Sequence, residues 1–271
     1  MKLGLFLRNM GPQSTRATLV ECARAAEDAG IDDLWVADHI AIPPDDAEGS
    51  GGRYLDPLAT LAFLAGCTTK ITLGTGVLVL PYRPPLPTAK WVATIQELSG
   101  GRLQLGVGAG WMEAEFRALG VRRTRRGALT DATLDFLRRC FAADEVEAND
   151  QRFLFLPRPP RPPIFVGGAA PHALRRIVRF GDGWMPTGTS GEQLGATIAE
   201  LRDAMAAAGR PVPEVALLTT LPLNDGARAA AQVSRLAAIG VTRVVHAWRY
   251  PDAAAFAKAA EVMCKHLKDA S

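Results

Sequence analysis

Short apolar runs alternate with longer amphipathic segments along almost the whole chain. Apolar runs between turn residues are typical of buried strands, whereas apolar residues three or four positions apart are typical of helices that cover a core. We therefore predict eight strands, at residues 3–7, 34–38, 71–80, 102–107, 164–166, 183–185, 215–219 and 243–247.

Helices are predicted between these strands, and the first of them ends at Gly30, which suits a left-handed C-cap. The predicted helices cover residues 15–29, 56–68, 87–98, 127–141, 171–180, 191–208, 226–238 and 252–267, with a further short helix after Gly110. This alternation favours an α/β fold in which parallel strands close into a (β/α)8 TIM barrel. A doubly wound open sheet is the alternative.

Residues 144–163 interrupt the alternation and end in a proline-rich segment, residues 157–163. The prolines predict a stiff, extended chain. We interpret the segment as an excursion before strand 5, which returns the chain to the bottom of the barrel. A domain linker is the alternative, but the same alternation resumes afterwards, so we expect a single domain over residues 1–271.

Composition narrows the classes of partner and location. The chain has 31 basic and 28 acidic residues, which predicts neither a nucleic-acid nor a membrane surface. No apolar segment is long enough to span a membrane, and the N-terminal apolar run is too short for a signal peptide. The four cysteines are scattered through segments predicted as helical. We expect free thiols and a soluble, cytoplasmic protein.

In a barrel of this kind, ligands bind at the carboxyl ends of the strands. Two stretches at such ends combine a strand, glycines and a following helix, which suits a phosphate held by backbone N–H groups. They are Gly106–Gly110 and Val166–Ala169. The first is not a dinucleotide signature, because Trp111 stands where the third glycine belongs. Tight βα turns without a ligand would also explain either stretch alone.

His39 follows Asp38 at the end of the second strand, and histidine suits proton transfer near neutral pH. A structural role for this histidine is the alternative. The chain has no HxH or HExxH pattern, so we predict no bound metal. It also lacks the GxSxG motif of a nucleophile elbow, so the sequence does not favour a serine hydrolase. The basic run Arg122–Arg126 is interpreted as a solvated loop, with an anion site as the alternative.

Several motifs together resemble the luciferase-like monooxygenase superfamily. They are Trp35–His39, Leu73–Pro85, Leu98–Trp111, Phe165–Gly168 and Gly181–Trp184. The resemblance covers nearly the whole chain and is weakest at residues 122–163 and after residue 210. The short chain and the histidine after Asp38 look most similar to the branch of oxidoreductases that use the deazaflavin coenzyme F420.

The resemblance implies a barrel that binds a tricyclic redox cofactor, with a cis peptide between Gly76 and Val77. The implied cofactor is coenzyme F420, and FMN is the alternative. His39 is then the candidate catalytic residue, and Asp38 either binds the cofactor or orients His39. The candidate cofactor-binding residues are Asp38, Thr75, Gly76, Val77, Gly108, Ala109, Gly110, Trp111, Val166, Gly167, Gly168 and Trp184.

The substrate is expected to be a small molecule of unidentified class. Candidate substrate contacts are Arg8, Asn9, Arg83, His246, Trp248 and Arg249. Arg8 and Met10 depart from the family's pattern at the end of the first strand. A second departure is Gln96-Glu97, which stands directly before Leu98 in place of the family's Asp-containing segment. An FMN-dependent monooxygenase and a barrel that binds a cofactor without turnover stay open, as does a homodimer.

Overall fold

A closed parallel barrel forms the centre of the computed structural model, which describes residues 1–188 and 191–268. The barrel strands run in the order β3-β2-β1-β11-β10-β9-β8-β5, and a pairing between β3 and β5 closes the ring. Their bounds are β1 Lys2–Phe6, β2 Asp33–Val36, β3 Thr72–Thr75, β5 Leu103–Gly108, β8 Ile164–Gly168, β9 Gly183–Pro186, β10 Glu214–Thr219 and β11 Arg243–His246. The predicted (β/α)8 barrel is confirmed, and the open sheet is wrong.

The third predicted strand, residues 71–80, is divided in the structure. β3 ends at Thr75, and the chain resumes as β4, Leu78–Val79, which pairs with β5. The peptide between them, Gly76–Val77, is cis, as predicted. The glycine pattern indicated an irregular strand, but only the pairing shows that the ladder itself is interrupted.

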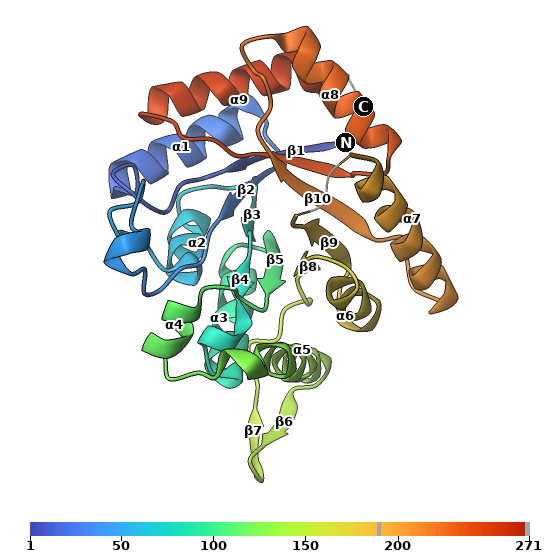
Figure 1. Cartoon of the computed structure of the whole chain (residues 1–271). Helices are drawn as coiled ribbons and strands as arrows, with labels where there is room; N and C mark the ends of the chain where they lie inside the picture. The colour runs from blue at the N-terminus through green and yellow to red at the C-terminus, as the bar shows by residue number, and fades with distance from the viewer. Residues whose placement is uncertain (189–190, 269–271) are drawn as a thin grey trace.

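Helices surround the barrel (Figure 1). They are α1 Arg16–Ala29, α2 Pro57–Ala65, α3 Pro85–Leu98, α4 Glu113–Ala118, α5 Arg126–Ala142, α6 His172–Phe180, α7 Gly191–Ala207, α8 Gly226–Ala238 and α9 Ala253–Leu267. Gly30 caps α1 in the left-handed conformation, as predicted. Cys67 was predicted to be helical but follows the end of α2. Among the described residues, no helix is long and apolar enough to cross a membrane.

The excursion before the fifth strand contains a hairpin that was not predicted. β6, Glu145–Ala148, pairs antiparallel with β7, Gln151–Leu154, around a turn in which Asn149 and Asp150 have positive φ. The hairpin projects away from the barrel (Figure 1). Each strand has only four residues: β6 alternates, with Val146 buried between two exposed glutamates, whereas β7 exposes Leu154, so the pattern is too short to predict the hairpin.

The amino end of the barrel is filled by a buried charged and aromatic cluster. Arg243, from the start of β11, pairs with Asp33 from the start of β2, and its guanidinium lies over the ring of Trp35 at 5.8 Å. Trp35 fits inside the barrel because Gly74 faces it: a Cβ on Gly74 would come within 2.4 Å of the indole. This end is therefore closed by side chains from the strands themselves.

Candidate functional site

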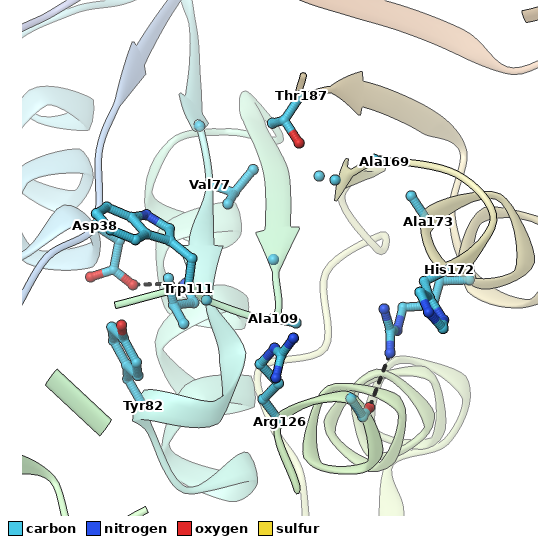
Figure 2. A pocket seen from close by; sticks show the side chains of 18 of the residues that line it. Asp38, Val77, Tyr82, Ala109, Trp111, Arg126, Ala169, His172, Ala173 and Thr187 are labelled. Carbon is cyan, nitrogen blue, oxygen red and sulfur yellow. Dashed lines mark hydrogen bonds between the residues drawn. The ribbon is translucent and has the colours of Figure 1, made fainter. Parts of the chain in front are cut away.

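A cleft of about 680 Å³ opens at the carboxyl ends of β2, β4, β5, β8 and β9. Its volume lies in the range of small-molecule and cofactor sites. Figure 2 shows Asp38 and Tyr82 on one side of this cleft, and His172 and Ala173 on the other. The two sides differ in chemistry. One carries carboxylates and aromatic rings, and the other carries cations.

His39 lines the carboxylate side and is held by a glutamate that the sequence did not single out. Its Nδ1 lies 2.9 Å from Oε2 of Glu115, which comes from α4. The backbone N–H groups of Ile40 and Ala41 donate to Oε1 of the same carboxylate, at 2.6 and 3.0 Å. Tyr82 donates its hydroxyl to Oε2 at 2.9 Å. Glu115 thus fixes the imidazole ring and the loop that follows it.

Glu115 is ionised at neutral pH although its side chain is fully buried. Burial raises the pKa of its carboxyl, but the hydrogen bonds from His39, the two backbone amides and Tyr82 outweigh burial and lower that pKa to about 2. A carboxylate accepts but cannot donate, so His39 carries a hydrogen on Nδ1. Nε2 is left as the ring nitrogen that can exchange a proton. With 20% of the side chain exposed, His39 is accessible from the cleft.

Two aromatic side chains adjoin His39. The ring of Tyr54 lies 5.0 Å from the imidazole, measured between centroids, and the ring of Trp111 lies 6.1 Å away in an edge arrangement. Trp111 is 67% exposed, and the neighbouring Ile40 is 45% exposed. Trp111 and Ile40 therefore add exposed apolar surface beside His39.

Asp38 lines the cleft but does not orient His39. Its carboxylate accepts two hydrogen bonds from the guanidinium of Arg83, at 2.6 and 2.9 Å, and one from the backbone N–H of Val79. Burial raises the pKa of Asp38, and the ion pair with Arg83 opposes that effect. The predicted alternative that Asp38 orients His39 is wrong, because Glu115 holds that ring.

Glycines keep the centre of the cleft free of side chains. Gly76, Gly108, Gly167 and Gly168 all line it. A Cβ added to Gly108 or Gly167 would approach the side chain of Val77 to 2.6 and 2.8 Å. Gly168 has φ +124°, a conformation that residues with a Cβ rarely adopt. The backbone is therefore exposed to a ligand around Val77.

Cations line the opposite side of the cleft. Arg126 begins α5, and Arg176 lies one turn into α6, which begins at His172. Arg176 pairs with Asp131 at 2.6 Å, whereas no described residue supplies a carboxylate partner for Arg126. The run Arg122–Arg126 is thus partly solvated loop and partly cleft wall. This side is suited to an anionic group.

Three of the candidate cofactor-binding residues lie outside the cleft lining. Thr75 is buried and donates its hydroxyl to the carbonyl of Gly106, Val166 packs in the core, and Trp184 donates its indole N–H to the carbonyl of Gly168. The remaining members line the cleft: Asp38, Gly76, Val77, Gly108, Ala109, Gly110, Trp111, Gly167 and Gly168. The predicted short helix after Gly110 is confirmed as α4, although it begins only at Glu113, so that Gly106–Gly110 does not itself form the first turn.

None of the predicted substrate contacts lines the cleft. Asn9 is buried, and its side-chain amide bonds the carbonyls of Ala37 and Leu55. His246 is buried too: Leu221 donates its N–H to the imidazole, and burial lowers the pKa of His246 to about 4. These two residues support the barrel rim.

The other four candidates are also engaged elsewhere. Arg8 donates to the carbonyl of Gly49, and Arg249 is exposed beside the same glycine. Arg83 bridges Asp38 and Asp56, while Trp248 stacks on His246. A position at the end of a strand is therefore not sufficient to place a side chain in the cleft, because several such side chains point toward the loops and the rim of the barrel.

Glu115 could not have been distinguished from Glu113 by sequence. Both lie in the first turn of the same six-residue helix, and the partner of Glu115 is 76 residues away. Within residues 1–188 and 191–268, no cluster of His, Cys, Asp and Glu could hold a metal ion.

Comparison with known proteins places this cleft in context. The profile of a family described as luciferase-like monooxygenase matches residues 1–266. An uncharacterized protein of Mycobacterium tuberculosis is 31% identical over 252 residues, which are 86% of this chain and 85% of that protein. The F420-dependent hydroxymycolic acid dehydrogenase of M. tuberculosis is 34% identical over 182 residues, 62% of this chain and 48% of that enzyme.

Solved structures with the same fold include enzymes of different chemistry. The monooxygenase RslO1 from Streptomyces bottropensis has a TM-score of 0.83 at 22% identity, and an F420-dependent secondary alcohol dehydrogenase has a TM-score of 0.82 at 17% identity. Each comparison covers 98% of both chains. At these identities the likeness shows the barrel fold alone.

Proposed function

This chain belongs to the luciferase-like monooxygenase family, and we propose that it is an oxidoreductase that uses coenzyme F420 to transfer a hydride to or from a small organic substrate. The observation that carries the proposal is the division of one cleft into a cationic side and a side that presents His39. A redox cofactor with an anionic arm needs both sides of the cleft: the cationic side holds the arm, and the reacting ring lies apart from it, beside His39.

The cleft fits such a cofactor in two respects. The bare backbone around Gly108, Gly167 and Gly168 accepts close approach of a flat ring or a phosphate. Arg126 and Arg176 would hold the phosphate and the acidic tail of coenzyme F420, with His172 beside them. FMN lacks that tail, so the additional arginines at positions 122–125 favour the deazaflavin.

The protein's own residues would position the substrate and move one proton. When bound, the deazaflavin ring supplies two-electron hydride chemistry. Glu115 fixes the tautomer of His39, so that Nε2 can accept or donate a proton at the substrate's heteroatom. Trp111 and Tyr54 would exclude water around that atom. His39 is then the acid or base, and Glu115 is a positioning residue.

Titration of the apoprotein with coenzyme F420 and with FMN tests the proposal. We expect coenzyme F420 to bind at least about tenfold more tightly, and its affinity to fall with salt because exposed charge attraction is screened. Arg126→Gln should weaken coenzyme F420 more than FMN. The control is Arg138→Gln, an exposed arginine of α5 outside the cleft. Tighter FMN binding would overturn the proposal and support an FMN-dependent monooxygenase.

A further inference from the structure

We propose that the rim of the barrel carries a second binding site, outside the cleft, for a multiply charged oxyanion such as a phosphate group. The guanidinium groups of Arg8 and Arg249 would bind this anion, and Arg53 would add a third positive charge beside them. None of these three residues lines the cleft, so the proposal does not depend on the proposed oxidoreductase function.

The fold brings Arg8 and Arg249 to the same sector of the rim. β1 and β11 are neighbouring parallel strands, in which Leu5 pairs with His246. Arg8 and Arg249 each lie three residues further along the chain, beyond the carboxyl ends of these strands. The backbone N–H of Arg8 donates to the hydroxyl of Tyr250 at 2.9 Å, which ties the two segments together.

Both guanidinium groups contact one residue of the loop after β2, Gly49. Nη2 of Arg8 donates to the carbonyl of Gly49 at 3.1 Å. A Cβ on Gly49 would lie 2.7 Å from Nη2 and 3.0 Å from Cζ of Arg249, so this second guanidinium packs against bare backbone. Gly49 has φ +78°, a conformation that favours glycine. The loop therefore holds two cations on the same residue.

No carboxylate of the protein neutralises this cluster. Within residues 1–188 and 191–268, neither Arg8, Arg53 nor Arg249 forms an ion pair. Arg53 donates instead to the hydroxyl and the carbonyl of Ser14, both at 2.9 Å. Its own carbonyl accepts from Gly11, and a Cβ on Gly11 would lie 3.3 Å from Nη2 of Arg8. Like charges held this near to one another repel, so a bound anion would stabilise them.

The hydrogen-bonding capacity of Arg8 and Arg249 is largely unused. A guanidinium has five N–H donors. In the described part of the chain, the side chain of Arg8 donates only to Gly49, and its Nε is buried without an acceptor. Arg249 is exposed and donates no side-chain hydrogen bond to a described residue. Because guanidinium groups bind phosphate through paired, charge-assisted hydrogen bonds, two of them with free donors suit a ligand with several anionic oxygens.

The site adjoins the wall of the cleft through Tyr54. Met10 and Tyr54 form an antiparallel bridge, which joins the segment after Arg8 to the loop after β2. The ring of Tyr54 lies 5.0 Å from the imidazole of His39. An anion bound to Arg8 and Arg249 would therefore order residues 47–53, the part of the loop that leads into Tyr54.

Pyrophosphate is the first probe of the site, and its binding would be measured by calorimetry. We expect Arg8→Gln and Arg249→Gln each to weaken it at least about tenfold, in line with the loss of one charged hydrogen-bond donor. Arg249→Gln breaks no hydrogen bond within the described chain, so this variant should fold like the wild type. The control is Arg126→Gln, which removes a cation of the cleft and should leave this binding unchanged. A loss in the control alone would overturn the proposal.

Hydrogen exchange locates the bound ion. Pyrophosphate should slow the exchange of the amides of residues 47–53 in the wild type but not in Arg249→Gln. Protection confined to residues 167–176 would place the ion on the cationic side of the cleft and would contradict a separate site.

Arg249→Glu supplies an anion from the protein itself. This variant should lose pyrophosphate binding at the rim, and its melting temperature should rise by about 1–3 °C, the effect of one exposed ion pair with Arg8. A lower melting temperature would show that the two arginines do not repel each other, against the proposal.

Inorganic phosphate and phenyl phosphate distinguish the source of the anion. Tighter binding of phenyl phosphate that depends on Arg249 would identify the phosphate group of an organic molecule, and equal binding would identify a free ion. If none of the three probes binds in a way that depends on Arg249, the site does not exist. These measurements need no coenzyme, so their outcome is separate from that of the cofactor titrations.

Discussion

A buried carboxylate lies at each end of the barrel, and the two have different partners. At the amino end, Asp33 pairs with Arg243, whose side chain is 1% exposed. At the carboxyl end, Glu115 pairs with His39, whose side chain is 20% exposed. A sealed pair can only hold the strands together, whereas a pair with one exposed partner can exchange a proton with a ligand. The exposure of one partner to solvent and ligands, rather than the type of residue, distinguishes the structural pair from the functional pair.

The neighbours of each pair support this distinction. Arg243 lies between the rings of Trp35 and Phe165, at 5.8 and 5.6 Å, and also bonds Glu214. His39 faces a cleft of about 680 Å³. Mutations at the amino end should therefore reduce stability, and mutations at the carboxyl end should reduce activity.

His39→Ala should give the largest effect on activity. We expect hydride transfer to fall about 10²- to 10⁴-fold, the usual contribution of general acid–base catalysis, because Nε2 no longer exchanges the substrate's proton. Affinity for the cofactor should stay within a few fold, since the cations and glycines that would hold it are elsewhere in the cleft. Single-turnover rates and cofactor titrations measure the two quantities. Near wild-type transfer by both His39→Ala and His39→Asn would end the catalytic assignment.

Arg243→Met should give the largest effect on stability, about 3–5 kcal/mol at neutral pH, because it leaves Asp33 buried without a cation. Burial already raises the pKa of Asp33. The loss should shrink as pH falls, since protonation removes the unpaired charge. Denaturant unfolding at two pH values measures this. A variant as stable as the wild type would contradict the distinction between the two ends.

Glu115→Gln should reduce transfer by about 10- to 100-fold at neutral pH. An amide that keeps its oxygen toward Ile40 and Ala41 turns its NH₂ toward His39, so that the imidazole must accept at Nδ1 and carry its hydrogen on Nε2. Proton acceptance at Nε2 is then lost. The matched control is Glu113→Gln on the same helix, which should retain full activity; equal losses in both variants would argue for a general effect on α4.

The same substitution has a consequence for stability below neutral pH. The pKa of Glu115 is about 2 in the folded chain against an ordinary value of 4.5. The stabilisation, of about 3 kcal/mol, is complete above the unfolded value and is lost as pH falls toward the folded value. Glu115→Gln should remove this part of the acid dependence. An unchanged unfolding profile between about pH 5 and 2 would refute it.

Gly168→Val should give the smallest effect, a loss of about tenfold in cofactor affinity. A β-branched residue at φ +124° is strained, and its side chain would stand in the cleft lining. Gly120→Val, at φ +67° and outside the cleft, imposes a similar backbone cost without that contact. Calorimetric titration of both variants isolates the contribution of the cleft. Equal affinities in the two would make Gly168 a structural glycine only.

The barrel follows from the sequence because each strand and helix has its own local pattern, as with Leu3–Leu7 or the helix that ends at Gly30. The ring of glycines around Val77 was also predictable, since close backbone approach requires residues without a side chain. The β6–β7 hairpin was not, because its strands have only four residues each, and the alternation in Glu145–Ala148 is too short to predict a strand by itself.

The composition of the site was decided by tertiary structure. The sequence identified His39 from its residue type and its place after a strand. It could not identify Glu115, because the pairing depends on where α4 packs against the loop after β2, 76 residues away. For the same reason Asn9, Arg83 and His246 looked like ligand contacts, although each is held by other residues of the chain. Local patterns determine which elements form, but the direction of a rim side chain depends on partners that only the closed barrel brings within reach.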